Sequence, residues 1–195
     1  MKILIYGSSH LTKIAVNLLR NTHYNLVGHI PSKCPTIKGD INLPIVDDSV
    51  EHDIKLSLQY DQKLYNIKNA YNIHTGLLPM WAGTDILYHS IYSDDINEQG
   101  LTFHKMGMKL DYGNIISKIT YPVCENDNMV SLYDKMVKIF PSFVLSSLNL
   151  LENMSLNDIN NCPKIIPRQF KRGNIKDMHR DIYSETLSIL KSKYE

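Results

Sequence analysis

Asn72 and His74 stand two positions apart at the start of the stretch Asn72-Ile73-His74-Thr75-Gly76-Leu77-Leu78-Pro79. On the end of a β-strand both side chains would leave the same face, because side chains alternate with a period of two. An amide donor beside an imidazole suits oxyanion stabilisation and proton transfer at a carbonyl group. The same two residue types are also common as hydrogen-bonded turn residues, so this stretch alone leaves both interpretations open.

The N-terminal third supplies the elements that would position such a strand. Lys2–Tyr6 is a short apolar run that ends at Gly7-Ser8-Ser9, and apolar residues at helical spacing follow from Leu11 to Leu19. Leu26–Ile30 reads as the next strand, so the segment predicts a β-α-β unit that opens a parallel sheet. The turn at Gly7-Ser8-Ser9 could hold an anion at the helix N-terminus or could be a tight turn without a ligand. The chain has no G-x-G-x-x-G, which gives a dinucleotide site poor support.

The remaining periodicity predicts further strands and helices around the Asn-His pair. Strands are expected at 53–60, at 101–105 and at 115–120, and a helix at 85–91. A long apolar stripe begins at Met129, with a break or kink expected at Pro141. A closing helix is expected over 177–193. Alternating strands and helices of this kind indicate an α/β protein.

Composition excludes several classes of protein. The chain has 195 residues, 43% of them hydrophobic, and a formal net charge of +1. This length suits one domain, and the charge gives no electrostatic case for nucleic acid or for an acidic membrane surface. The three cysteines, at 34, 124 and 162, are far apart, which argues against a zinc site or a disulfide framework and fits a reducing compartment. We therefore expect a cytoplasmic protein without a membrane span.

Residues 72–116 resemble the folate-dependent formyltransferase family. That family has an Asn-x-His followed by a Leu-Leu-Pro loop and a glycine, matched by Asn72, His74, Leu77-Leu78-Pro79 and Gly83. A Gly-hydrophobic-Thr strand is matched by Gly100-Leu101-Thr102, and an Asp-x-Gly loop before an Ile-Ile strand is matched by Asp111-Tyr112-Gly113 and Ile115-Ile116. The resemblance implies that Asn72, His74 and Asp111 are the catalytic residues.

The resemblance also implies the fold and its organisation. We expect a Rossmann-like formyltransferase fold of the α/β class, with a mostly parallel, twisted sheet flanked by helices. Residues 1–160 would form the catalytic domain, and residues 161–195 a basic C-terminal segment and closing helix packed on the same domain. The layout is similar to that of sugar N-formyltransferases and of the catalytic domain of methionyl-tRNA formyltransferase.

The function implied is transfer of a formyl group from N10-formyltetrahydrofolate to a primary amine, without a metal. Carried over from the family, one set of residues would bind the folate: Gln59, Tyr60, Asp61, Gln62, Lys63, Leu64, Leu110 and Gly113. A second set would bind the acceptor: Gly7, Ser8, Ser9, Thr75, Gly76, Trp81 and His104. Trp81 could instead cover a core edge, and His104 could instead be a solvated residue on a strand face.

The acceptor is the open part of the prediction. The layout favours the amino sugar of a nucleotide sugar as a small-molecule partner. Phosphoribosylglycinamide formyltransferase is the alternative, but relatives of that kind carry Gly-Ser-Asn where this chain has Ser8-Ser9-His10. A formyltetrahydrofolate hydrolase or a silent folate-binding module stays open as well. Two further questions stay open: whether Arg168, Lys171 and Arg172 touch a substrate phosphate, and whether Phe143 and Leu151 are core residues or part of a homodimer interface.

Overall fold

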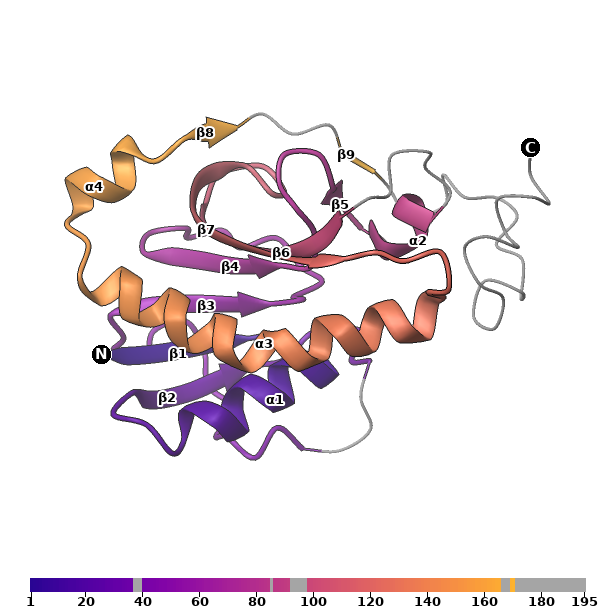
Figure 1. Cartoon of the computed structure of the whole chain (residues 1–195). Helices are drawn as coiled ribbons and strands as arrows, with labels where there is room; N and C mark the ends of the chain where they lie inside the picture. Colours follow the sequence, from indigo (N-terminus) through magenta and orange to yellow (C-terminus); the bar gives the residue numbers. More distant parts are fainter. Residues whose placement is uncertain (37–39, 85, 92–97, 166–168, 171–195) are drawn as a thin grey trace.

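The computed structural model describes residues 1–36, 40–84, 86–91, 98–165 and 169–170 (Figure 1). Of Tyr88, Glu98, Ile165, Gln169 and Phe170 only the backbone is described. The elements, in chain order, are β1 (Lys2–Tyr6), α1 (His10–Leu19), β2 (Asn25–Ile30), β3 (Ile54–Leu58), β4 (Ala70–His74), β5 (Ala82–Gly83), α2 (Ile86–Ile91), β6 (Glu98–Met106), β7 (Gly113–Pro122), α3 (Met129–Glu152), α4 (Leu156–Asn161), β8 (Lys164–Ile165) and β9 (Gln169–Phe170).

Seven of the described strands form one sheet, in the order β2-β1-β3-β4-β6-β7-β8. The strands β2, β1, β3 and β4 run parallel to one another. Beyond β4 the direction alternates, because β6, β7 and β8 each pair antiparallel with the strand before them. The predicted α/β class and the parallel β-α-β opening are therefore confirmed. A second small sheet pairs β5 with β9 in parallel.

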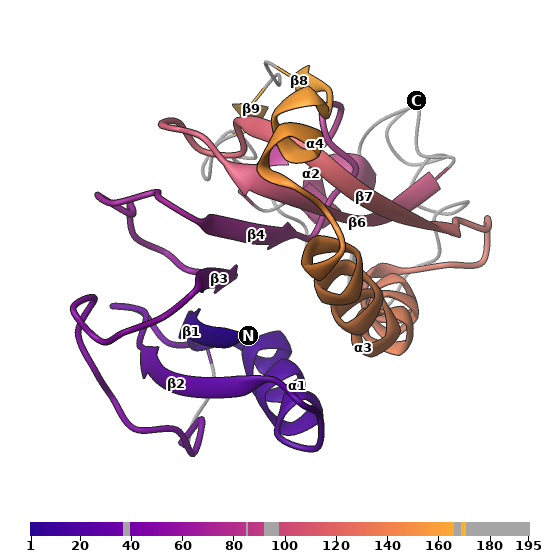
Figure 2. The same ribbon diagram turned by 90° about the vertical axis from the view of Figure 1, so that its left-hand side faces the viewer.

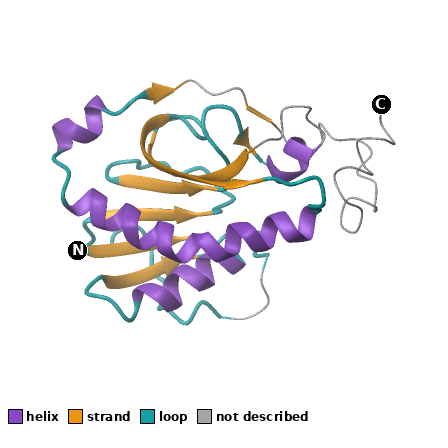
Figure 3. Ribbon diagram, in the orientation of Figure 1, coloured by secondary structure: helices purple, strands orange, loops and turns teal. Residues whose placement is uncertain are grey.

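Helices α1 and α3 cover one face of this sheet, and both lie on the same side of it when the molecule is turned by 90° (Figure 2). Helix α1 begins with a capping box, in which Ser9 and Thr12 each accept a hydrogen bond from the backbone N–H of the other. The stripe of α1 that faces the sheet is fully buried and consists of Leu11, Thr12, Ala15, Val16 and Leu19. The opposite face of β1 and β4 packs against loop residues such as Val46, Tyr60 and Leu64. Among the described elements, helices α1 and α3 lie on one face of the parallel half (Figure 3).

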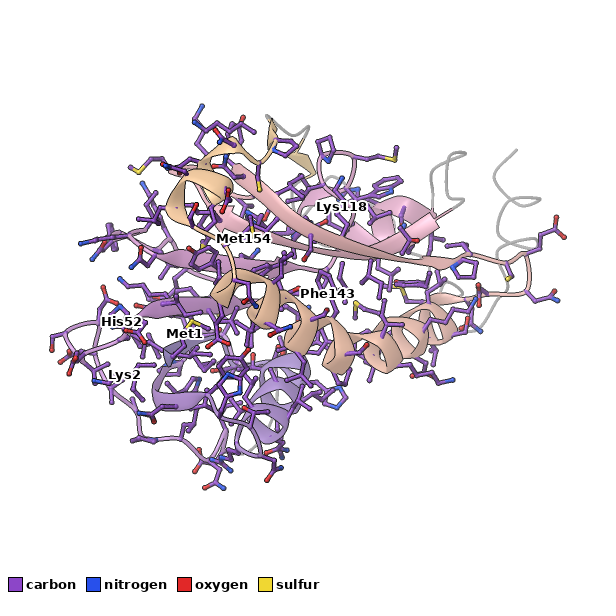
Figure 4. All side chains as sticks on the ribbon, turned by 60° about the vertical axis from the view of Figure 1, so that its left-hand side comes forward. Met1, Lys2, His52, Lys118, Phe143 and Met154 are labelled. Atoms are coloured by element: carbon purple, nitrogen blue, oxygen red, sulfur yellow. The ribbon has the colours of Figure 1, made fainter. Side chains whose placement is uncertain are left out.

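Helix α3 runs unbroken across the sheet with Pro141 inside it, so the break expected there does not occur. Phe143 and Leu151 are buried, at 3% and 6% exposure, in the main hydrophobic core. Figure 4 shows Phe143 on this helix. The two residues are therefore core residues of the chain itself, and they offer no exposed interface for a homodimer.

The segment after α3 is joined to the main sheet. Strand β8 pairs with β7 at Asn114 and Lys164, and the Asn114 amide donates hydrogen bonds to the carbonyls of Asn160 and Cys162. The expected boundary between residues 160 and 161 falls inside α4. The expected helix over 177–193, together with Arg168, Lys171 and Arg172, lies outside the described residues.

Candidate active site

Strand β4 presents Asn72 and His74 on one face, as the alternation in the sequence predicts. Tyr71 and Ile73 point the other way, into the core beneath the helices, at 3% and 2% exposure. Asn72 is partly exposed and His74 is buried. Because β4 is one of the parallel strands, this pair lies at the carboxyl edge of the sheet, where open α/β sheets bind their ligands.

Strand β6 lies antiparallel beside β4 and places a second pair of polar residues against the first. His104 stands opposite Asn72, and Thr102 stands opposite His74. The Thr102 hydroxyl donates a hydrogen bond to the carbonyl of Gly76 at 2.7 Å and accepts one from the backbone N–H of Leu78 at 3.0 Å. Thr102 therefore fixes the loop that follows His74.

Asp111 reaches the same place from the turn between β6 and β7. Its φ of 57° lies in the left-handed region, which few residues other than glycine adopt. Its carboxylate is buried, with Oδ1 3.4 Å from Nδ1 of His74. The other oxygen, Oδ2, accepts a hydrogen bond from the backbone N–H of Gly83 at 2.6 Å. The sheet and this turn thus bring the three predicted catalytic residues together.

The His74 ring is held from its far side by the loop. Nε2 lies 2.6 Å from the carbonyl oxygen of Trp81, which can only accept, so Nε2 carries a hydrogen. The other ring nitrogen, Nδ1, is the one that faces Asp111. Gly76 makes this arrangement possible, because a Cβ there would lie 2.9 Å from Nε2 and 2.5 Å from the Trp81 oxygen.

His104 is a neutral imidazole behind Asn72. Burial, with a smaller contribution from nearby His74, lowers the pKa of His104 to about 4. Its Nδ1 donates to the carbonyl of Lys105 at 3.2 Å, which leaves Nε2 as an acceptor. Nδ2 of Asn72 lies 3.1 Å from that Nε2 and donates to it. One of the two hydrogens on Asn72 Nδ2 is therefore bonded to His104, and the other takes no part in this contact.

The arrangement combines an oriented amide donor, an imidazole and a carboxylate that faces one nitrogen of that imidazole. Such a set can hold negative charge on a carbonyl oxygen and can move a proton next to it. Among the described residues, no group of three or more His, Cys, Asp or Glu side chains could hold a metal ion. None of the described helices is both long and apolar enough to cross a membrane.

The residues predicted to bind folate lie in two loops at this edge. Gln59 follows β3 with a φ of 54°, and Asp61 accepts hydrogen bonds from the backbone N–H groups of Lys33 and Cys34, at 3.0 and 2.7 Å. Leu64 is buried against the loop-covered face of the sheet. The remaining positions are partly or fully exposed, namely Gln59, Tyr60, Asp61, Gln62, Lys63, Leu110 and Gly113. Their contact with folate stays a prediction.

The residues predicted to bind the acceptor include the turn Gly7-Ser8-Ser9, whose hydroxyls have partners within the chain. Ser8 accepts a hydrogen bond from the backbone N–H of Ser32, and Ser9 caps its own helix. A Cβ at Gly7 would lie 2.1 Å from the carbonyl oxygen of Leu58, so this glycine is needed for packing. A substrate role for this turn stays a prediction.

The other predicted acceptor residues differ in exposure. Thr75 is partly exposed, whereas Trp81 and His104 are buried, at 3% and 1% exposure. The Trp81 side chain is buried and its carbonyl contacts His74, and a contact of the side chain with the acceptor stays a prediction. The sequence pointed to neither that carbonyl nor the N–H of Gly83, because every residue has these groups. Thr102, which fixes the loop after His74, could be found in the sequence through the Gly100-Leu101-Thr102 motif.

Comparison with known proteins finds similarity to formyltransferases. Residues 65–147 match the model of the formyl transferase family, which confirms the resemblance seen in the sequence. The sugar 3N-formyltransferase WlaRD, solved in the presence of dTDP and 5-N-formyl-THF, has a TM-score of 0.75 at 24% identity, over 97% of this chain and 76% of that chain. An N-formyltransferase from Helicobacter canadensis, solved with folinic acid and dTDP-3-aminofucose, has a TM-score of 0.77 at 19% identity, over 97% and 78%.

A glycinamide ribonucleotide transformylase is similar as well. Glycinamide ribonucleotide transformylase 1 from Symbiobacterium toebii has a TM-score of 0.66 at 15% identity, over 86% of this chain and 94% of that chain. At these identities the solved structures establish that the fold is shared. The predicted formyltransferase fold is thus confirmed.

Proposed function

We propose that this chain, which has the formyltransferase fold and matches the formyl transferase family over residues 65–147, transfers a formyl group from N10-formyltetrahydrofolate to a primary amine. The observation that carries the proposal is the meeting of Asn72, His74 and Asp111 at the carboxyl edge of the sheet, with 3.4 Å between His74 Nδ1 and Asp111 Oδ1. These are the groups that acyl transfer to an amine requires.

In the proposed reaction the amine nitrogen attacks the formyl carbon and the carbonyl oxygen becomes an oxyanion. The amide hydrogen of Asn72 that His104 does not engage donates to this oxyanion. Nδ1 of His74, when protonated, is a second donor, and Asp111 holds the ring in place from 3.4 Å. The two donors are fixed before the reaction, so the oxyanion is stabilised without rearrangement of the site.

The second half of the proposed reaction transfers protons. The attacking amine loses a proton, the bond between the formyl carbon and N10 breaks, and N10 gains a proton. Asp111 accepts the proton of the amine, directly or through a water molecule, and His74 Nδ1 can return a proton to N10. No covalent enzyme intermediate is needed, because the amine displaces the folate nitrogen directly.

The acceptor we propose is an amino sugar carried on a nucleotide. Two similar solved structures are sugar formyltransferases, one of them solved with a dTDP-linked aminofucose. The turn after β1 also carries Ser8-Ser9-His10 where glycinamide ribonucleotide transformylases resemble one another in carrying Gly-Ser-Asn, which favours the sugar over that acceptor.

Glycinamide ribonucleotide is the second candidate acceptor. The structure of Symbiobacterium toebii glycinamide ribonucleotide transformylase 1 favours it, because this chain covers 94% of that enzyme. The two candidates differ in the nucleoside diphosphate that only the sugar substrate carries, so one assay can separate them.

The test measures tetrahydrofolate release from N10-formyltetrahydrofolate by the purified protein. The donor is given alone, then with a panel of dTDP- and UDP-linked amino sugars, then with glycinamide ribonucleotide. Release that depends on an amino sugar, with a formamido product seen by mass spectrometry, is the expected result. Release without any acceptor would identify a hydrolase, and no release under any condition would overturn the proposal.

A pair of variants ties any activity to the site. Asn72→Ala removes one oxyanion donor and should lower kcat at least about a hundredfold. Asn149→Ala changes an exposed residue of α3 and should leave kcat unchanged. Equal activity of the two variants would place the chemistry elsewhere in the chain.

A further inference from the structure

We infer that His104 is a positioning residue, whose neutral imidazole holds the side-chain amide of Asn72 with one N–H directed toward the reacting carbonyl. The inference rests on the proposed function. It gives His104 a different role from the substrate contact that the sequence suggested. Four observations support it: the strand register, the exposure of the two side chains, the hydrogen-bond roles and the protonation of the ring.

The register of the sheet places the two side chains face to face. Asn72 of β4 stands directly opposite His104 of β6 in the antiparallel pair, where opposed side chains lie close enough to interact. Both backbones belong to central strands of the seven-stranded sheet. The contact between them is therefore held by the sheet and does not depend on a loop.

Exposure separates the roles of the two residues. His104 is 1% exposed, whereas Asn72 is partly exposed. A substrate at the edge of the sheet can thus reach the Asn72 amide, while the His104 ring lies behind it. Direct contact between His104 and an acceptor would require the surrounding residues to move.

The donor and acceptor roles of the Asn72 amide and the His104 ring are complementary. Nδ1 of His104 faces the Lys105 carbonyl at 3.2 Å, an acceptor, so it carries the hydrogen. The unprotonated Nε2 accepts from Nδ2 of Asn72 at 3.1 Å. A flipped Asn72 would present its carbonyl oxygen to Nε2, and two acceptors would then face each other. Neutral His104 therefore selects the orientation in which the amide group of Asn72 can donate.

Burial keeps His104 neutral near pH 7. The pKa of His104 falls to about 4, chiefly through loss of solvation and then through the neighbouring His74, while Asp111 and backbone carbonyl groups act in the opposite direction. A protonated ring would offer a hydrogen at Nε2 and would favour the flipped amide. The neutral state of the His104 ring and the orientation of the Asn72 amide are thus linked.

The test is a double-mutant cycle on kcat. His104→Leu removes the acceptor and should lower kcat by about tenfold to a hundredfold, because a reacting group is misplaced, while KM for donor and acceptor stays within about twofold of the wild-type value. In an Asn72→Ala background the same substitution should change kcat less than about twofold, since its only route of action is gone. His104→Gln, whose amide oxygen can accept the hydrogen bond, should recover part of the activity.

A matched cycle controls for loss of stability. Phe103 is the buried neighbour of His104 on β6 and points to the opposite face, into the main core. Any effect of Phe103→Leu on kcat should therefore multiply with that of Asn72→Ala. The inference is overturned if the fold-losses in kcat caused by His104→Leu and Asn72→Ala also multiply in the double variant. It is overturned as well if His104→Leu raises KM for the acceptor and leaves kcat unchanged.

A second measurement does not depend on any activity. In ¹⁵N-labelled protein, the side-chain NH₂ signals of Asn72 should shift and exchange faster in His104→Leu than in wild type. Unchanged signals would overturn the inference even if no acceptor had been found. A wild-type protein with the expected signals but no formyl transfer would instead count against the proposed function alone.

Discussion

The Asp111 carboxylate lies between the His74 ring and the Gly83 backbone. Its Oδ1 is 3.4 Å from His74 Nδ1, and its Oδ2 accepts a hydrogen bond from the N–H of Gly83 at 2.6 Å. Asp111→Asn keeps the shape of the side chain and can keep the contact to Gly83 through Oδ1. Its amide nitrogen would then face His74 Nδ1 as a donor, which forces that nitrogen to stay unprotonated. We expect kcat to fall at least about a hundredfold, because the site loses a donor and a proton acceptor together.

The measurement for Asp111→Asn is steady-state kinetics with the acceptor found in the release assay. Circular dichroism and the unfolding midpoint should show a folded protein. Asp134→Asn, at an exposed position of α3, is the control of the same chemistry. If Asp111→Asn kept near-wild-type turnover, neither the charge nor the protonation of Asp111 would matter to the reaction.

Gly76 gives the second prediction. A Cβ at this position would lie 2.5 Å from the Trp81 carbonyl oxygen and 2.9 Å from His74 Nε2. Gly76→Ala should therefore push the loop away from the ring and break the bond that holds His74. We expect at least about a tenfold loss of kcat, since a displacement of about 1 Å can cost up to a hundredfold.

Met80→Ala is the matched control for this loop, because Met80 is 58% exposed and its truncation removes no contact to His74. Both variants are compared by kcat and by a crystal structure of Gly76→Ala. An unchanged distance between Nε2 and the Trp81 oxygen, together with normal kcat, would show that the loop tolerates a methyl group and that the prediction is wrong.

Thr102 gives a prediction about stability. Thr102→Val preserves the size of a fully buried side chain but removes the hydroxyl shared by the Gly76 carbonyl and the Leu78 N–H. Buried polar groups left without partners typically cost about 1–3 kcal/mol each. Urea unfolding should show a loss of about this size, whereas Thr120→Val at an exposed site of β7 should change little. Equal stability of the two variants would mean that water replaces the hydroxyl.

Much of the sheet could be predicted from the sequence because its signals are local. The run Ile3–Ile5 is apolar on both faces, as expected of a central parallel strand, and all of it is fully buried. Asn72 and His74 leave the same face because strand periodicity requires it. The break expected at Pro141 is absent, since the apolar stripe of α3 is buried on both sides of the proline and the helix continues through it.

The candidate site was less open to prediction because its contacts join distant segments. Asp111 was paired with His74 only through the family resemblance, and no periodicity links the two positions. The Trp81 carbonyl and the Gly83 N–H hold His74 and Asp111, yet any residue type except proline at the N–H position could supply them. The burial of His104 behind Asn72 depends on the register of β4 and β6, which the sequence does not specify residue by residue.

His104 makes the stability of the protein depend on pH. Its pKa is about 4 in the folded chain against 6.5 ordinarily, so the unfolded chain binds a proton first as the pH falls. The contribution of neutral His104 is fully present above pH 6.5 and is lost progressively toward pH 4. A pKa difference of this size lowers the free energy of unfolding by about 3 kcal/mol over the whole pH range. About 2 kcal/mol of this loss falls between pH 7.5 and pH 5.

Urea unfolding of wild type and His104→Gln at several pH values isolates this contribution. The free energy of unfolding of wild type should fall by about 2 kcal/mol more than that of His104→Gln between pH 7.5 and pH 5. All other histidines are common to both proteins, so their effects cancel in the difference. Parallel curves would mean that His104 titrates alike in the folded and unfolded chains, and burial would then not be what keeps its ring neutral.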